Sequence, residues 1–198
     1  SVAQNIDRLF FSQNGGLRGE YQELYKSLFR VAEPYERIVC ALGTRKVGMT
    51  RSAVAEAAGL NDNGALTKYL EELEQCGFVR KYLAFGKIGK DALFQLVDNF
   101  TLFYFCFRTA IQRGAENYWL EKLDAQSHVV WTGLAFERVC LLHVQQIRIA
   151  LGISGVATNV CSWSGADENG RRAQIDLLLD RNDRVITLCE MKFADEAY

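Results

Sequence analysis

Hydrophobic residues recur every three or four positions through most of the first half of the chain, a spacing typical of amphipathic helices. Residues 20–30 show this spacing first, and a second helix is expected after Pro34, which suits the first turn of a helix. Thr50 is a suitable amino-terminal cap for a third helix over residues 51–58. A longer helix is expected over residues 63–75. The pattern therefore predicts a run of helices before the first pair of strands.

Two hydrophobic runs over residues 78–83 and 92–97 then predict a β-hairpin whose connection is rich in glycine and basic residues. Helices followed by a hairpin in this order predict a winged helix-turn-helix over residues 19–98. The hairpin supplies four candidate contacts to the phosphates of a nucleic acid, which are Arg80, Lys81, Lys87 and Lys90.

The helix over residues 63–75 is poorly suited to bind DNA. It carries Glu71, Glu72 and Glu74 against a single lysine, Lys68, and this exposed face would repel phosphate. An acidic helix beside a basic hairpin leaves two interpretations open. The winged helix either binds nucleic acid weakly through its hairpin or docks onto a protein or another domain, and docking is favoured.

The segments outside the winged helix differ in composition. Residues 1–18 are polar and contain Gly15 and Gly16, which predicts a linker from an upstream domain. Residues 99–128 begin with a strongly aromatic run, which predicts buried connecting helices. At their end, His128 is expected to be a solvated loop residue.

The last part of the chain, residues 129–198, changes from a helix pattern to a strand pattern. Residues 131–151 are hydrophobic on nearly all sides and predict a helix that is buried on more than one face. A strand over residues 155–163 follows. Two short hydrophobic runs over residues 173–179 and 185–192, joined by a polar turn, then predict a pair of strands.

Both of these last strands carry ionisable residues where a buried strand normally has none. Asp176 lies in the first, and Glu190 and Lys192 lie in the second. Buried charges are costly unless they are paired or bind a cation. Side chains alternate across a strand, so Glu190 and Lys192 share one face, and Gln174 shares the face of Asp176 as a candidate substrate contact. Two carboxylates that hold a magnesium ion, beside a lysine that steers water or neutralises phosphate, predict a phosphodiester hydrolase site.

This pair of strands resembles the PD-(D/E)XK motif of nuclease-like proteins, with Asp176 as the first acid and Glu190-Met191-Lys192 as the second half. Together with further motifs, it resembles the carboxy-terminal region of archaeal-type, DEXX-box ATP-binding proteins. The motifs that carry this resemblance are Asn5-Ile6-Asp7-Arg8-Leu9-Phe10, Gly77-Phe78-Val79-Arg80, Trp131-x-Gly133-x-x-Phe136-Glu137, Leu151-Gly152-Ile153, Gln174-Ile175-Asp176-Leu177 and Cys189-Glu190-Met191-Lys192-Phe193.

The resemblance covers residues 5–198 and implies an α+β protein in which a winged helix-turn-helix domain precedes a restriction-endonuclease-like α/β domain. It implies that Glu137, from the helix before the sheet, is a third acid of the site, so that Asp176, Glu190 and Glu137 together bind Mg²⁺ or Mn²⁺. The family places a P-loop ATPase upstream, so ATP is expected to bind only in that domain, which is also the expected partner. The family's core continues with a helix and a strand after Lys192, so the nuclease-like domain is expected to be incomplete at its carboxy terminus.

Composition narrows the remaining possibilities. The 198 residues are 49% hydrophobic and 24% charged, values of a folded globular protein, and a formal net charge of −1 gives no overall attraction to nucleic acid. Six cysteines without a C-x-x-C pair predict small core residues of a protein from a reducing compartment. No signal peptide and no apolar run of about 18 residues is present, so we expect a cytoplasmic protein without membrane contact.

Three functional hypotheses follow. The first is a metal-dependent nuclease-like domain that works as the effector part of an ATPase, with Lys192 assisting the attacking water. The second is a catalytically silent binding module in which Glu137, Asp176, Glu190 and Lys192 form a buried ion network. The third is a transcription factor that reads DNA through its winged helix, which the acidic helix disfavours. The oligomeric state stays open.

Overall fold

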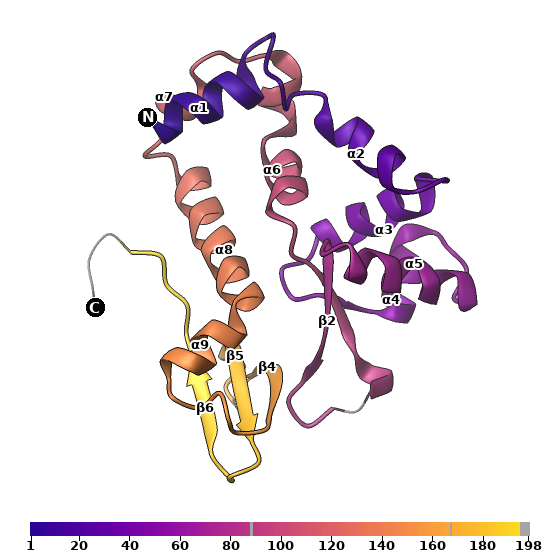
Figure 1. Ribbon diagram of the computed structural model, residues 1–198, viewed down its shortest axis with the longest axis vertical. Coiled ribbons are helices and arrows are strands. Elements are labelled where there is room, and N and C mark those ends of the chain that lie inside the picture. The colour runs from indigo at the N-terminus through magenta and orange to yellow at the C-terminus, as the bar shows by residue number, and fades with distance from the viewer. Residues whose placement is uncertain (88, 167, 195–198) are drawn as a thin grey trace.

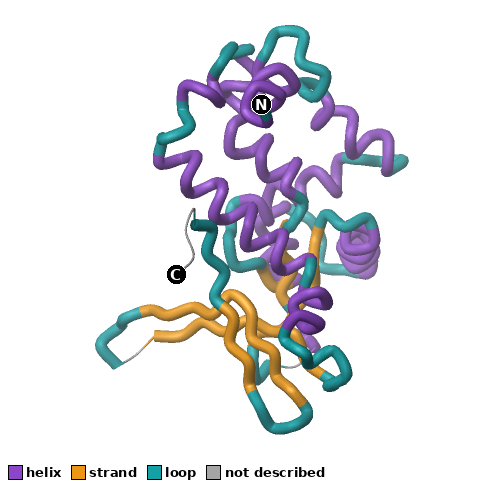
Figure 2. The backbone as a smooth tube through the Cα atoms, turned by 60° about the vertical axis from the view of Figure 1, so that its left-hand side comes forward, coloured by secondary structure: helices purple, strands orange, loops and turns teal. Residues whose placement is uncertain are grey.

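The chain folds into a helical upper part above a single mixed sheet, an α+β architecture (Figures 1 and 2). The computed structural model describes residues 1–87, 89–166 and 168–194, with the side chain of residue 90 set apart from the description. Over these ranges, the helices are all too short or too polar to cross a membrane.

The polar amino-terminal segment is helical and packed, in contrast to the linker expected from its composition. Helix α1 (Val2–Ile6) runs into a π-helical turn, η1 (Asp7–Phe11). Phe11 is fully buried in an aromatic cluster with Phe103 and Trp119. The few hydrophobic residues of this segment are therefore enough to fix it, because they insert between helices that come much later in the chain.

The four helices expected next are all present, and one hydrophobic core joins them. Pro34 lies in the first turn of the second helix, and the Thr50 side chain accepts a hydrogen bond from the Ala53 amide at the start of the third. Gly59 ends that third helix with φ 61°, a left-handed conformation that favours glycine. The helices are α2 (Glu20–Leu28), α3 (Glu33–Gly43), α4 (Arg51–Ala58) and α5 (Gly64–Gln75). Their buried face includes Ile38, Leu42, Leu66, Leu70 and Leu73.

Within the described residues, the sheet has six strands in the order β1-β3-β2-β4-β5-β6. The expected hairpin is formed by β2 and β3, which are antiparallel, and β4, β5 and β6 form an antiparallel meander. Between these two parts, β2 and β4 pair in parallel at Leu83↔Cys161 and Ala84↔Ser162. The strands are β1 (Met49–Thr50), β2 (Val79–Ala84), β3 (Leu93–Leu96), β4 (Thr158–Ala166), β5 (Arg172–Arg181) and β6 (Ile186–Cys189), with a short 3-10 turn, η2 (Gly89–Asp91), in the hairpin connection.

This parallel pairing joins the two predicted domains into one continuous sheet. The Phe85 amide extends the junction by donating to the Ser162 carbonyl at 2.8 Å. The hairpin of residues 19–98 is therefore the direct neighbour of the strands that carry the candidate acids. The two predicted regions therefore share one sheet.

The connecting helices cover the space above the sheet. Helix α6 is the aromatic helix predicted after the hairpin, and it is buried along much of its length. A break at His143, with φ −111°, divides the long helix expected over residues 131–151 into two. The bounds are α6 (Asn99–Arg113), α7 (Tyr118–Glu121), α8 (Gln126–Leu142) and α9 (Val144–Ala150).

His128 is not a solvated loop residue, and the sequence prediction for it is wrong. It lies in the first turn of α8 and is only 4% exposed. Its Nδ1–H donates to the Lys122 carbonyl at 2.6 Å, and its ring packs against Trp119. The helix begins several residues earlier than its hydrophobic pattern suggests, which draws this histidine into the aromatic cluster.

The cysteines also differ from expectation. All six are free thiols, but Cys40, Cys76 and Cys106 are exposed, and only Cys161 is fully buried. The sequence predicted core residues because the cysteines lie in apolar runs. Such a run also contains residues on the outward-facing side of its helix, so some of these cysteines are exposed.

Candidate acidic site on the carboxy-terminal strands

Asp176 lies in the middle of β5, between residues that point into the core. Leu177 and Leu179 are fully buried in a cluster with Leu141 and Ile153, and α8 and α9 cover this face of the sheet. The β4–β5 register shifts between Cys161 and Trp163, so Asp176 and Leu177 together lie opposite Ser162, and the simple alternation of side chains is interrupted there. Asp176 is half-buried, and its Oδ2 accepts a hydrogen bond from the Met191 amide at 3.2 Å.

Glu190 follows β6 directly, and the register relates it to Asp176. The last pair of the ladder is Leu177↔Cys189, so the next residues along each strand are Asp176 and Glu190. Cys189 and Met191 both pack against the Leu177 cluster, which directs Glu190, between them, to the other face. Asp176 and Glu190 are therefore neighbours across the two strands.

Lys192 and Glu190 form an ion pair with their charged atoms 2.9 Å apart. Both side chains are more than half exposed, at 62% and 55%, so this pair contributes at most about 1 kcal/mol to folding. The strand itself ends at Cys189, and both residues lie in the extended segment after it rather than inside a buried strand. The expected sharing of a face by Glu190 and Lys192 agrees with their contact.

Glu137 approaches the site from α8. Burial raises the pKa of its carboxyl group, and the nearby carboxylate of Asp176 raises that pKa further. The cationic groups of Arg138, Lys46 and Arg80 act in the opposite direction. Glu137 thus lies within electrostatic range of Asp176, with three cations around it.

The helix that carries Glu137 packs on the Leu177 face. No set of three His, Cys, Asp or Glu side chains close enough to share a metal ion occurs within residues 1–87, 89–166 and 168–194. The structure brings Asp176 and Glu190 together across two strands and places Glu137 within reach of the Asp176 charge. It does not gather all three around one point.

Arg80 has a different environment from the exposed hairpin residue that the sequence predicted. Its Nε–H donates to Gln95 Oε1 at 2.6 Å, and its guanidinium lies 4.2 Å from the centre of the Tyr82 ring. Gln95 is 4% exposed and donates in turn to the Lys46 carbonyl. Burial lowers the pKa of Arg80, although an arginine stays protonated at neutral pH. Arg80 is therefore a cation held beside Glu137, and the sequence did not indicate the supporting roles of Tyr82 and Gln95.

The other candidate substrate contacts occupy the expected surface. Lys81 and Lys87 are exposed on the hairpin, and the side chain of Lys90 falls outside the described part of the chain. Gln174 is exposed on β5, two residues before Asp176, but the register shift of the β4–β5 ladder interrupts the alternation, so the expected shared face of the two residues does not follow.

The arginine that follows Glu137 is the most unusual group near the site. Arg138 is only 5% exposed, and burial lowers its pKa. Its Nη1 donates to the Leu134 carbonyl at 2.9 Å, while its Nε has no hydrogen-bond partner among the described residues. A buried guanidinium held by so few contacts is stabilised by the neighbouring Glu137 charge, which gives Glu137 a structural role beside any catalytic one.

Comparisons of the chain with protein-family models, curated proteins and solved structures found no match. The function is therefore argued from the geometry of this site.

Proposed function

We propose that this chain is a metal-dependent phosphodiester hydrolase that acts on nucleic acid. The observation that carries the proposal is the register of β5 and β6, which makes Asp176 and Glu190 neighbours across the two strands, with Lys192 2.9 Å from Glu190. A carboxylate pair with an adjacent amine is the minimal set of groups for hydrolysis of a phosphodiester.

The side chains present fit a hard divalent cation such as Mg²⁺ or Mn²⁺. Magnesium is commonly bound through one or two carboxylates and several waters, so the two acids on this face suffice without a third protein ligand. The opposing charge of Asp176 raises the pKa of Glu137, and a cation between the strands and α8 would relieve that repulsion. When bound, the ion supplies Lewis-acid polarisation of the phosphoryl oxygen and a more acidic water.

The residues of the site have separate roles in the proposed hydrolysis. Asp176 and Glu190 hold the ion, and the Met191 amide keeps the Asp176 carboxylate oriented through its hydrogen bond. Lys192 leaves its exposed ion pair with Glu190 at a cost of about 1 kcal/mol or less and places its ammonium beside the attacked phosphate. Glu137, whose pKa is raised by burial and by Asp176 and lowered in part by the charges of Arg138 and Arg80, adds a further ionisable group beside Asp176.

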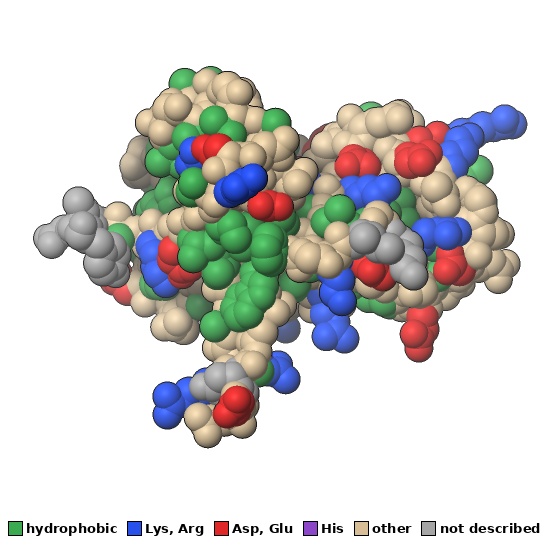
Figure 3. Space-filling view, turned by 90° about the horizontal axis from the view of Figure 1, so that it is seen from below, with side chains coloured by type: hydrophobic (Ala, Val, Ile, Leu, Met, Phe, Trp, Pro, Cys, Tyr) green, Lys and Arg blue, Asp and Glu red, His purple; other side chains and the backbone are tan. Residues whose placement is uncertain are grey.

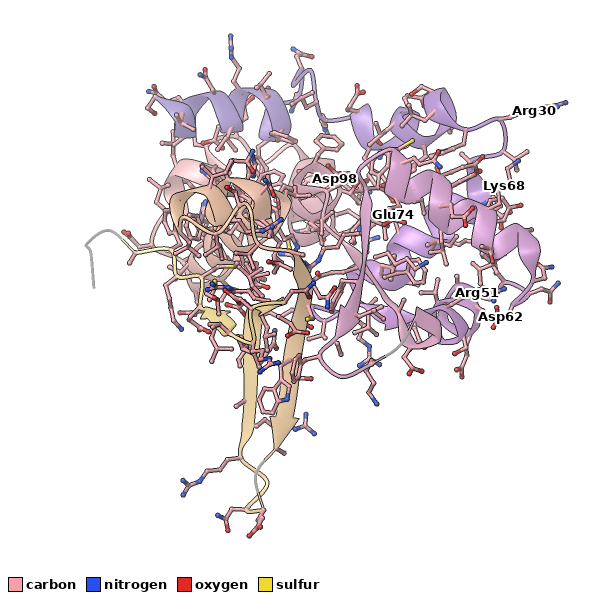
Figure 4. All side chains as sticks on the ribbon, turned by 60° about the horizontal axis from the view of Figure 1, so that its bottom comes forward. Arg30, Arg51, Asp62, Lys68, Glu74 and Asp98 are labelled. Atoms are coloured by element: carbon pink, nitrogen blue, oxygen red, sulfur yellow. The ribbon has the colours of Figure 1, made fainter. Side chains whose placement is uncertain are left out.

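In the same proposal, residues 19–98 form a winged helix-turn-helix and residues 129–198 form a restriction-endonuclease-like domain. The order of α3, α4, α5 and the β2–β3 hairpin supports the first assignment. Lys68 and Glu74 project from α5, as Figure 4 shows, and the helix carries more acidic than basic groups. We assign α5 to docking against another domain, in line with an effector role for this chain beside an ATPase that binds the ATP.

One observation favours a second function, that of a catalytically silent binding module. The contacts of the site are satisfied without any ligand, because Lys192 pairs with Glu190 and the Met191 amide pairs with Asp176. In this alternative the four ionic groups fix the sheet, and the surface of the chain binds a partner.

Cleavage of nucleic acid separates the two functions. Supercoiled plasmid and labelled single-stranded oligonucleotides are incubated with the protein and Mg²⁺ or Mn²⁺, and with Asp176→Asn and Lys192→Ala variants whose melting temperatures are measured alongside. The hydrolase predicts nicking that needs the metal and is lost in both variants while they stay folded. Absence of cleavage by the wild type, together with a lower melting temperature for Lys192→Ala, would establish the silent module instead.

A further inference from the structure

A groove of about 560 Å³ lies between the β2–β3 hairpin and the strands of the candidate site. Strands β2 and β4 are paired at Leu83↔Cys161 and Ala84↔Ser162, a contact too short to close the space beside it. One wall includes Lys81, Phe85 and Lys87 from the hairpin. The other wall includes Asn159 and Asp180 from β4 and β5.

The groove opens on the same face of the sheet as Glu190. Lys81 and Leu83 share a face of β2, and Leu83 is paired with Cys161, so these side chains lie on the face of Asn159 and Cys161. Cys161 is paired in turn with Leu178, and Leu178 with Leu188, which alternation places on the face of Asp180 and Glu190. The hairpin lysines and Glu190, the neighbour of Asp176, therefore line one continuous surface.

The path along this surface is short. Asp180 lines the groove, and Asp176 lies four residues away on the same strand, which corresponds to about 13 Å at 3.3 Å per residue. An extended nucleic-acid strand covers that distance with a few nucleotides. A strand seated in the groove could thus present one of its phosphates to Asp176 and Glu190.

The lining has the chemistry of a single-strand site. Lys81 and Lys87 carry two ammonium groups against the one carboxylate of Asp180, and both lysines are exposed. The Phe85 ring is 39% exposed and is available to stack on a base. A basic groove with an aromatic platform is typical of proteins that bind single strands, whereas a double helix is too wide for a groove of this volume.

In the space-filling view of Figure 3, charged groups surround a hydrophobic patch at the end of the molecule that carries the turns between strands. The exposed hydrophobic residues of β4 and β6 are Val160, Trp163, Ile186 and Leu188. Bases that leave the groove along this face would meet an apolar surface rather than a charged one.

We propose that this groove binds a single strand of nucleic acid by its phosphates and one stacked base, and leads it to Asp176. The direction toward Asp176 rests on the proposed hydrolase function, but binding in the groove does not depend on it. The β2–β3 hairpin of residues 19–98 therefore forms one wall of a substrate-binding groove, and the strands of residues 129–198 form the other.

The test is fluorescence anisotropy with a labelled oligonucleotide of about a dozen nucleotides, in EDTA so that no metal contributes. We expect single-stranded DNA or RNA to bind more tightly than the same sequence as a duplex. In a Lys81→Gln/Lys87→Gln variant, affinity should fall at least tenfold, and the slope of log affinity against log salt should decrease in magnitude by about 1.4, which is the loss of two phosphate contacts. Phe85→Ala should weaken binding by about tenfold through the loss of one stacked base.

Lys68→Gln on α5 and Lys122→Gln after α7 remove the same charge elsewhere and should leave binding unchanged. Equal affinity and salt slope for the wild type and the double lysine variant would overturn the proposal, and so would tighter binding of the duplex. The Asp176→Asn variant separates the two proposals, because it should bind in EDTA as the wild type does. Groove binding without any metal-dependent cleavage would refute the hydrolase alone, and cleavage unaffected by the lysine and Phe85 variants would refute the groove alone.

Discussion

Replacing Glu137 with glutamine tests the electrostatic arrangement of the candidate site through protein stability. Glutamine keeps the shape of the side chain and removes its charge. In the folded protein, burial and the Asp176 carboxylate raise the pKa of Glu137 above its ordinary value of 4.5. The unfolded chain therefore releases this proton at lower pH than the folded protein does.

The sign of the effect follows from proton linkage. Above about pH 4.5 the folded state holds the Glu137 proton more tightly than the unfolded state, so raising the pH destabilises the wild type. The free energy of unfolding of the wild type should fall relative to that of Glu137→Gln, with a slope that approaches about 1.4 kcal/mol per pH unit. The fall begins near the ordinary pKa of glutamic acid and stops once the raised pKa of the folded protein has been passed.

Urea unfolding followed by circular dichroism, in EDTA between about pH 4 and about pH 8, measures this difference. Asp176→Asn should reduce the fall, because it removes the opposing carboxylate, and Arg80→Gln should increase it, because it removes a stabilising cation. If the wild type and Glu137→Gln have parallel stability curves over this range, Glu137 does not feel the charge of Asp176 and the assignment of these two acids to one site is wrong.

Two further substitutions test the fold that supports the site. Asp7→Ala should lower the free energy of unfolding by about 2–4 kcal/mol, because the buried Asp7 carboxylate accepts hydrogen bonds from the Trp119 amide at 2.8 Å and the Leu120 amide at 3.0 Å. In urea unfolding, Asp7→Asn should restore part of this loss, and no loss in Asp7→Ala would show that the amino-terminal segment is not docked. Leu177→Ala should lower the free energy of unfolding by about 2–5 kcal/mol, because Leu177 is fully buried. Leu188→Ala changes a side chain that is 61% exposed on the neighbouring strand and should change this free energy by less than about 0.5 kcal/mol. Equal effects of the two substitutions would contradict the register of β5 and β6.

Local patterns predicted most of the helices and strands in this chain. The spacing of hydrophobic residues located α2 to α5, and the caps at Thr50 and Gly59 fixed the ends of α4. The expected pairing of the last two strands also agrees with the structure, since Asp176 and Glu190 follow the Leu177↔Cys189 pair as neighbours. These features depend on residues that are close in sequence, where the period of the pattern is sufficient.

Features that depend on distant residues were not predictable in this way. Nothing in the pattern of β2 indicates that it pairs with β4, nearly eighty residues later, and the groove beside that junction exists only because of the pairing. The docking of Phe11 and the burial of His128 have the same origin, because both depend on an aromatic cluster assembled from separate helices. The position of Arg80 beside Glu137 likewise follows from the joined sheet rather than from the hairpin sequence.

The central claim is that Asp176 and Glu190 bind one divalent cation. Titration of Mn²⁺ into the protein by isothermal calorimetry, with the wild type compared with Asp176→Asn and Glu190→Gln, measures it directly. The account predicts saturable binding by the wild type and its loss in both variants, which should keep the wild-type melting temperature in EDTA. Equal heats from all three proteins would contradict it.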